Sequence, residues 1–247
     1  MISSFLESLS RAFYIAKKDA KVYYFKAPNF TYGILMPISL FIAFSLAGQI
    51  KPVIVVSGLT ALAVLFGTTS IEAVAVVLEK QTGTFERLQV APISFFTLVL
   101  GKALAGFFFG LVLAAAMIIP VTILSGTGIA NPVLFFVAVA FSSLTFSALG
   151  VLVSAYAKWV PEAQMLDNFL RFPMAFLSGI FFPLSAVPTQ LQLIPRLLPL
   201  TYSMEALRGA VVESTLTSTY LLDIIVMGLF SSALLAIAAK VLKTKTG

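Results

Sequence analysis

Charged side chains are rare in this chain, and four of them lie within one ten-residue segment. Charged residues make up 11% of the sequence. Residues 79–88, which follow one long apolar run and precede another, nevertheless contain Glu79, Lys80, Glu86 and Arg87. Carboxylates and basic groups so close together can form charge-assisted hydrogen bonds with another protein. The segment therefore predicts a contact surface rather than a catalytic centre.

The same segment contains residues that favour turns. Thr82, Gly83 and Thr84 interrupt the apolar pattern, and Pro92 follows a few residues later. Because Gly and Pro mark turns, we expect residues 79–94 to hold a short helix at a fixed angle, so that its charges can grip a partner. The plain alternative is an ordinary solvated loop with a basic bias.

The composition excludes several kinds of active site. The chain has no cysteine and no histidine, which excludes thiol nucleophiles, His-based triads and His metal sites. A phosphate-binding loop, G-x-x-x-x-G-K-[ST], is incomplete here. Phe96 takes the place of its first glycine, and Ala103 follows Gly101-Lys102 where a hydroxyl residue is needed. We expect no metal and no cofactor on this chain, and no ATP site of its own.

Glu72, Asp167 and Arg171 are ionisable residues that fall inside apolar runs. Glu72 precedes Glu79 by seven residues, which is about 10 Å along a helix. A carboxylate inside a membrane indicates function by default, although Glu72 could instead reach the interface or pair with a lysine. Asp167 and Arg171 are four residues apart and can pair on one helix face, which favours a structural role.

The apolar content indicates a membrane protein. Hydrophobic residues make up 60% of the chain, and the mean hydropathy is +1.04, whereas soluble domains are about 45–50% apolar. The net charge of +6 comes from basic residues that flank apolar segments and form no stripe, which argues against nucleic acid. We predict an all-α polytopic membrane protein, formed by one transmembrane domain over residues 1–247.

Six apolar segments are long enough to be transmembrane helices. A stretch before the third, residues 93–100, could be a separate interfacial helix. Prolines break the apolar segment 183–200, which predicts a short re-entrant hairpin on the outer side between spans five and six. The six predicted spans are residues 30–47, 53–78, 102–124, 132–156, 163–182 and 220–241.

Residues 5–24 have the pattern of a helix that lies on the membrane. Apolar side chains recur on one face, and Arg11, Lys18 and Lys21 lie on the other. Such a helix binds membrane lipid at the interface. The alternative is a helix on the soluble side that packs against the loops.

The Lys and Arg distribution predicts the orientation. Of the 16 basic residues, all but Lys51, Arg196 and Arg208 flank the predicted spans on one side. We therefore expect both termini to be cytoplasmic and the protein to lie in the cytoplasmic membrane.

Two motifs carry a resemblance to a known family. One is the order E-K-x-x-G-T-x-E-R-L-x-x-x-P-I-S at 79–94, followed by Gly101-Lys102. The other is FLSGIFFPL at 176–184, with LLPLTY at 197–202 and EALRG at 205–209. Together they resemble the type-2 permeases of ATP-binding-cassette transporters, and the resemblance extends over nearly the whole chain. It implies that the first motif is where a separate ATPase subunit docks, through Glu79, Lys80, Gly83, Thr84, Glu86, Arg87, Leu88 and Pro92.

The resemblance also implies a function. The chain would be the membrane subunit of an ATP-driven exporter, not an enzyme, with ATP and Mg on the partner ATPase. A second permease chain is expected, identical or similar to this one, and the cargo would be amphipathic, lipid-like or polymeric. Two alternatives remain open. An ion-gradient-driven transporter would need ionisable groups near the midplane, where only Glu72 comes close. The other alternative is a non-transporting scaffold or an intramembrane enzyme, and the enzyme would need a polar cluster inside the spans.

Overall fold

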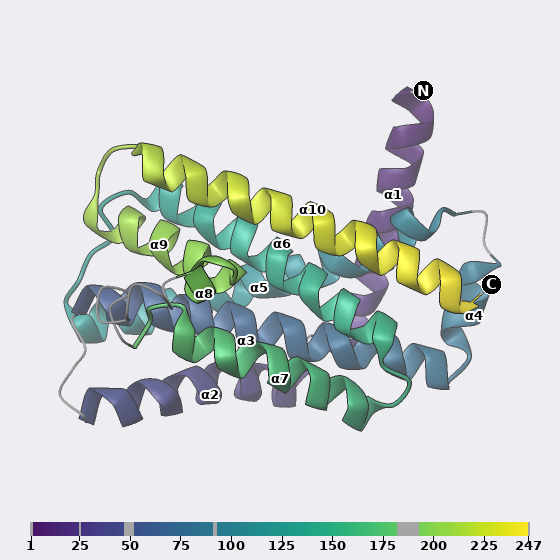
Figure 1. Ribbon diagram of the computed structural model, residues 1–247, viewed down its shortest axis with the longest axis horizontal. Helices are drawn as coiled ribbons and strands as arrows, with labels where there is room; N and C mark the ends of the chain where they lie inside the picture. The colour runs from purple at the N-terminus through teal and green to yellow at the C-terminus, as the bar shows by residue number, and fades with distance from the viewer. Residues whose placement is uncertain (1, 25, 47–51, 91–92, 182–192, 247) are drawn as a thin grey trace.

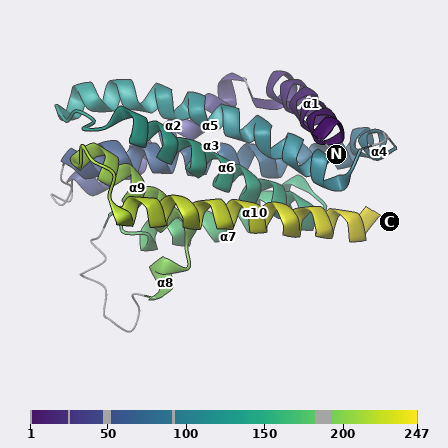
Figure 2. The same cartoon turned by 90° about the horizontal axis from the view of Figure 1, so that it is seen from above.

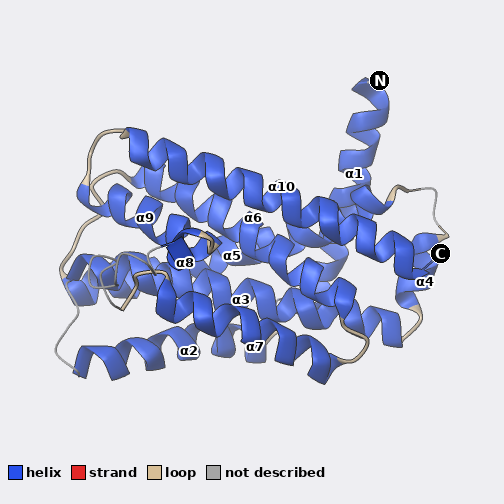
Figure 3. Cartoon of the chain, in the orientation of Figure 1, coloured by secondary structure: helices blue, strands red, loops and turns tan. Residues whose placement is uncertain are grey.

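A computed structural model describes residues 2–24, 26–46, 52–90, 93–181 and 193–246. Within these ranges the chain is helical and contains no strand (Figure 3). This confirms the all-α fold class. The long helices run side by side, and both termini lie at one end of the bundle, the end that also holds α4 (Thr84–Gln89) (Figures 1 and 2).

Four of the described helices are long and apolar enough to cross a membrane. Two further helices, α2 (Ala27–Leu46) and α7 (Val160–Leu177), flank α3, at the positions of predicted spans one and five. α7 is shorter than the four and carries Glu162, Asp167 and Arg171. A multi-pass helical membrane protein is therefore established, whereas the count of six spans stays a prediction. The four long helices are α3 (Pro52–Gln81), α5 (Phe95–Ser125), α6 (Pro132–Tyr156) and α10 (Ser218–Thr246).

The predicted break between an interfacial helix at 93–100 and the third span is wrong. A single helix, α5, runs from Phe95 to Ser125. Ser94 caps its first turn, because its hydroxyl accepts a hydrogen bond from the backbone N–H of Thr97 at 3.0 Å. The helix continues through Gly101, and α1 (Ile2–Asp19) packs directly against that glycine.

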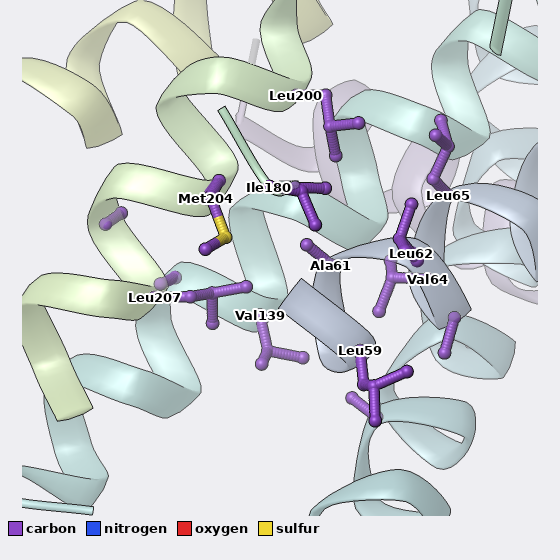
Figure 4. Packing of buried hydrophobic residues seen from close by; sticks show 14 of the residues in the cluster. Leu59, Ala61, Leu62, Val64, Leu65, Val139, Ile180, Leu200, Met204 and Leu207 are labelled. Carbon is purple, nitrogen blue, oxygen red and sulfur yellow. The ribbon is translucent and has the colours of Figure 1, made fainter. Parts of the chain in front are cut away.

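α3 is the central helix of the bundle. It packs against α2, α5, α6, α7 and α9 (Pro199–Val212), and most of its length is buried, whereas most of α10 is exposed. Leu62 and Leu65 of α3 belong to one apolar cluster with Val139 of α6 and Leu207 of α9 (Figure 4). Lipid is as apolar as these side chains, so close packing rather than water exclusion stabilises the cluster inside a membrane.

Glycines allow the helices around α3 to approach closely. A Cβ at Gly106 of α5 would lie 2.1 Å from the hydroxyl of Ser147, and one at Gly110 would lie 2.6 Å from that of Ser143. Both serines belong to α6. This spacing of small residues is typical of tightly packed membrane helices.

The end of the bundle opposite α4 carries two short helices, α8 (Leu193–Arg196) and α9. The hydroxyl of Thr201 donates to the carbonyl of Pro195 at 2.5 Å, and the hydroxyl of Tyr202 donates to the carbonyl of Arg196 at 2.7 Å. These bonds fix α8 to the start of α9. Most of the predicted outer hairpin, residues 183–192, lies outside the described residues, so the hairpin stays a prediction.

We expect Gly106→Val to destabilise the bundle. The new side chain would overlap Ser147 of α6, and such overpacking costs about 1–3 kcal/mol. Thermal unfolding of the detergent-purified protein measures the effect. Gly209→Val is the matched control, because a Cβ there meets nothing within 4 Å. Equal melting temperatures for the two variants would contradict the packing described here.

Candidate functional site

Four charged side chains form a cluster at the α4 end of the bundle. Lys102 of α5 lies 2.7 Å from Asp19 of α1 and also bonds the carboxylate of Glu79 of α3. Lys18 of α1 lies 2.5 Å from Glu79 and 2.8 Å from Asp19. Two lysines and two carboxylates thus join three helices that are far apart in the sequence.

The cluster is mostly buried. The side chains of Asp19, Glu79 and Lys102 are each 1% exposed, whereas that of Lys18 is 40% exposed. Its formal charges cancel. A buried charge is tolerated where it is paired and hydrogen-bonded, and removing one partner of a buried pair costs about 3–5 kcal/mol. The cluster therefore holds α1 in one position against α3 and α5.

The proton on Lys18 is held firmly. Partial burial alone would lower the pKa of Lys18, but the adjacent carboxylates of Asp19 and Glu79 outweigh that effect and raise the pKa above its ordinary value. Lys18 consequently stays charged at any physiological pH.

A tight turn joins α3 to α4. Gly83 adopts a left-handed backbone with φ of 69°, a conformation that glycine reaches without strain. The Thr82 hydroxyl donates to the carbonyl of Leu78 at 2.9 Å and accepts from the Thr84 hydroxyl at 2.6 Å. Both hydroxyl oxygens also lie 3.3 Å from the carbonyl oxygen of Glu79. The angle between α3 and α4 is thus set by hydrogen bonds, as the turn residues predicted.

The four charges of segment 79–88 divide into two groups. Glu79 is buried in the ion cluster, and Lys80 turns inward, where its ammonium donates to the carbonyl of Ser154 of α6 at 2.6 Å. Glu86 and Arg87 of α4 are exposed. The expectation that all four side chains grip a partner therefore changes, because only the second pair lies on the outer surface.

The rest of α4 is anchored inward. Phe85 is 1% exposed and belongs to an apolar cluster with residues of α3, α5, α6 and α10, against which Leu88 also packs. Gly83 and Thr84 form the turn described above. Pro92 lies outside the described residues. α4 thus presents a charged face outward from a fixed apolar base.

α1 crosses the end of the bundle and extends away from it (Figure 1). Ala12 and Ala16 of the predicted apolar face are buried, but Phe13 of that face is exposed. A Cβ at Gly101 of α5 would lie 2.9 Å from the carbonyl oxygen of Ala12. The buried face is therefore rotated toward Asp19, because α5 binds the helix there through the ion cluster.

The three basic residues predicted on the polar face of residues 5–24 have different surroundings. Arg11 pairs with Glu7 at 2.5 Å on the surface, and Lys21, in the π-helical turn Ala20–Tyr24 that follows α1, is exposed. Lys18 belongs to the ion cluster. The exposed Phe13 and Tyr14, with Lys21, leave a surface suited to a lipid interface.

Glu72 is enclosed by helix backbones. It is 1% exposed, and neither carboxylate oxygen has a hydrogen-bond partner in the described part of the chain. A Cβ at Gly150 of α6 would lie 2.8 Å from the Glu72 Cβ, and one at Gly106 would lie 3.4 Å from a Glu72 carboxylate oxygen. Among the described residues Glu72 therefore forms no ion pair with a lysine, which was one of the alternatives weighed from the sequence.

Asp167 and Arg171 pair within α7, as their spacing indicates. Arg171 Nη1 lies 2.9 Å from Asp167 Oδ2, and Ser70 of α3 donates to the same oxygen at 3.1 Å. The guanidinium also lies 4.7 Å from the ring centroid of Phe66. The pair joins α7 to α3, which suits a structural role.

Sequence reasoning missed Asp19 and Lys102 as members of the site. Lys102 is the only charged residue of α5, and an isolated charge within an apolar helix calls for a buried partner. That signal was available, but Lys102 also fits the basic flank of a span. Asp19 lies next to Lys18 and near Lys21, so a local surface pair was its obvious interpretation.

The long apolar helices define a multi-pass membrane protein, and comparison with known families defines its class. Residues 8–212 match the family described as ABC-2 type transporter. The chain belongs to this family and is a membrane component of such a transporter. The resemblance inferred from the two motifs is thereby confirmed.

Two relatives, both named Nodulation protein J, match part of the chain. The protein of Sinorhizobium fredii is 33% identical over 75 residues, which are 30% of this chain and 29% of the relative. That of Rhizobium leguminosarum bv. viciae is 31% identical over 103 residues, which are 39% of this chain and 40% of the relative. This chain thus aligns with less than half the length of either relative.

We expect Lys102→Met to destabilise the protein strongly. Methionine is similar in length but leaves the buried carboxylates of Asp19 and Glu79 with the half-exposed Lys18 as their shared cation, which should cost about 3–5 kcal/mol. Thermal unfolding in detergent measures this loss. Lys21→Met serves as the control, since Lys21 is exposed. The cluster would have no stabilising role if both variants melted together.

Proposed function

We propose that this chain is the membrane subunit of an ATP-driven exporter and that a separate ATPase subunit docks on α4. The observation that supports this most is the division of segment 79–88. Glu86 and Arg87 face outward, while Phe85 fixes the same helix to the bundle. A partner that binds the outer pair would therefore push on a rigid element.

The ion cluster gives that push a route into the bundle. α4 is joined to the central helix α3 by a hydrogen-bonded turn, and Glu79, immediately before the turn, is bound to Lys18 of α1 and Lys102 of α5. A displacement of α4 would move the ends of α1, α3 and α5 together. We propose that these three helices tilt as a unit during transport.

Energy would come from the partner. The near match to a phosphate-binding loop forms part of α5, with Gly101 packed against Ala12 and Lys102 bound to two carboxylates. Those contacts leave neither residue free for a nucleotide phosphate. ATP and Mg would thus bind the ATPase, and this chain would act as a transport subunit rather than an enzyme.

The transport path would require a second permease chain, identical or similar to this one. We propose that the path opens between the two copies, beneath the outer segment 183–200, and carries an amphipathic, lipid-like or polymeric substrate. The exposed apolar residues of α7, among them Met165 and Phe169, supply a surface for either a second copy or lipid.

The protein would lie in the cytoplasmic membrane with both termini inside. Both ends of the chain lie at the α4 end of the bundle (Figure 2), as an even number of crossings requires. Most of the Lys and Arg residues flank the helices at that end, in agreement with the positive-inside rule.

One observation favours the alternative of an ion-gradient-driven transporter. Glu72 is a buried carboxylate without a hydrogen-bond partner among the described residues, and such groups serve as ion or proton sites in secondary transporters. No partner ATPase would then be needed.

Replacing both Glu86 and Arg87 by alanine should uncouple ATP hydrolysis from transport. Both side chains lie on the surface, so the fold should persist. Reconstituted vesicles containing the permease and its co-purified ATPase allow both rates to be measured, and we expect transport per ATP to fall at least about tenfold, the equivalent of about 1.4 kcal/mol.

The matched control removes another charged pair at the same end of the bundle. Glu162 accepts a hydrogen bond from the backbone N–H of Lys158 at the start of α7, at 2.7 Å. The Lys158→Ala, Glu162→Ala variant should couple normally. If the α4 variant coupled as well as this control, docking on α4 would be refuted.

Glu72→Gln distinguishes the two energy sources. Glutamine has nearly the same shape as glutamate but carries neither a charge nor a titratable proton. The transport rate of an ATP-driven exporter should therefore change by no more than about twofold, which is far less than the tenfold change that corresponds to about 1.4 kcal/mol. A transporter driven by a proton or cation gradient should lose it. Uptake into energised vesicles, with and without ATP, separates these outcomes.

A further inference from the structure

A polar cavity lies at the end of the bundle opposite α4, between α9 and the first turns of α10. Its volume is about 410 Å³, within the range of about 300–1,000 Å³ that is usual for small-molecule sites. Four charged side chains line it, together with Gly209, Val212, Tyr220 and two threonines. The charged residues are Glu205, Arg208, Glu213 and Asp223.

Asp223 is the unusual member of this group. It is 4% exposed and borders the cavity, yet it forms no ion pair with the described residues. Among the described residues no hydrogen bond to its carboxylate is found either, and its oxygens, unlike those of Glu72, are not sealed from the surroundings. Burying a carboxylate in this way is costly unless a cation pairs with it.

The surrounding charges do not supply that cation. Three carboxylates and one guanidinium border the cavity, which leaves it a net charge of −2 by formal count. No ion pair joins Asp223 to Arg196 or Arg208 among the described residues, and the carboxylate of Glu205 is near enough to repel a negative charge on Asp223. The cavity is therefore electrostatically suited to a positive ligand.

Two of the remaining lining groups, Thr219 and Tyr220, already donate their hydroxyl protons and keep their oxygens as acceptors. Tyr220 donates its hydroxyl proton to the carbonyl of Leu134 at 2.6 Å, so its oxygen is left as an acceptor. Thr219 donates to Thr217 at 3.1 Å. A protonated amine has three donors and no acceptor, and carboxylate and hydroxyl oxygens match that requirement.

We propose that this cavity binds the protonated amine of a small organic molecule or of a lipid headgroup, with Asp223 as its charged partner. Glu205, at the exposed rim, would attract the cation into the cavity. A bare metal ion suits the site less well. No group of three carboxylate, His or Cys side chains with metal-binding geometry occurs among the described residues, and the volume far exceeds the roughly 30 Å³ share of one water molecule.

Ethanolamine is the probe, and N-acetylethanolamine is its uncharged match. Ligand-observed NMR on the full chain in detergent detects weak binding of each. We expect ethanolamine to bind and the acetylated probe to bind at least about tenfold more weakly, because charge-assisted hydrogen bonds are about twice as strong as neutral ones. Asp223→Asn should weaken ethanolamine binding by a similar factor.

Two further variants keep the test decisive. Glu205→Gln changes an exposed rim residue and should weaken binding severalfold without affecting the fold, whereas Glu7→Gln removes an exposed carboxylate on α1 and should change nothing. Nanodiscs of phosphatidylethanolamine and of phosphatidylglycerol separate the two sources of amine. If only the first lipid displaces free ethanolamine, the site takes a headgroup, and if neither does, it takes a soluble amine.

The proposal is overturned if both probes bind equally, or if the Asp223 and Glu205 variants bind ethanolamine as the Glu7 variant does. Neither result bears on the exporter function, since these measurements need no ATPase and the cavity lies at the end of the bundle opposite α4.

Discussion

A buried set of alternating charges organises the α4 end of this bundle. Asp19, Glu79 and Lys102 lie almost completely out of solvent, where each is tolerable only because the others are present. Apolar packing in a membrane is weakly directional, whereas charge pairs demand particular partners. The cluster therefore specifies which face of α1 meets α5, and it sets the position from which the chain enters the turn to α4.

Much of the fold could be predicted from the sequence because apolar runs report membrane helices directly. The boundaries of α6 at Pro132 and Tyr156 match those expected, since Asn131 and Pro132 mark a helix start. The start of α5 could not be placed in the same way. The sequence predicts a third span that begins at Lys102, whereas α5 begins at Phe95, and the contact of Gly101 with α1 involves residues distant in sequence.

The candidate site was predicted in part. The turn at Gly83 and the outward pair Glu86 and Arg87 follow from residue types within a short segment. Glu79 and Lys80 point inward because Glu79 is bound by Lys102 and Lys80 by the carbonyl of Ser154. Both partners are distant in sequence. Local patterns cannot reveal which of several neighbouring charges a remote helix will neutralise, so the segment's division into two groups required the structure.

The bond between Lys80 and the Ser154 carbonyl has a consequence for how the bundle can open. It ties the last turn of α3 to the last turn of α6, while in the middle of α6 the hydroxyl of Ser142 is hydrogen-bonded to that of Ser203 of α9. Two rods pinned at one end separate by splaying, not by sliding. If α3 and α6 move apart, they would therefore stay together at the α4 end and separate more toward α9.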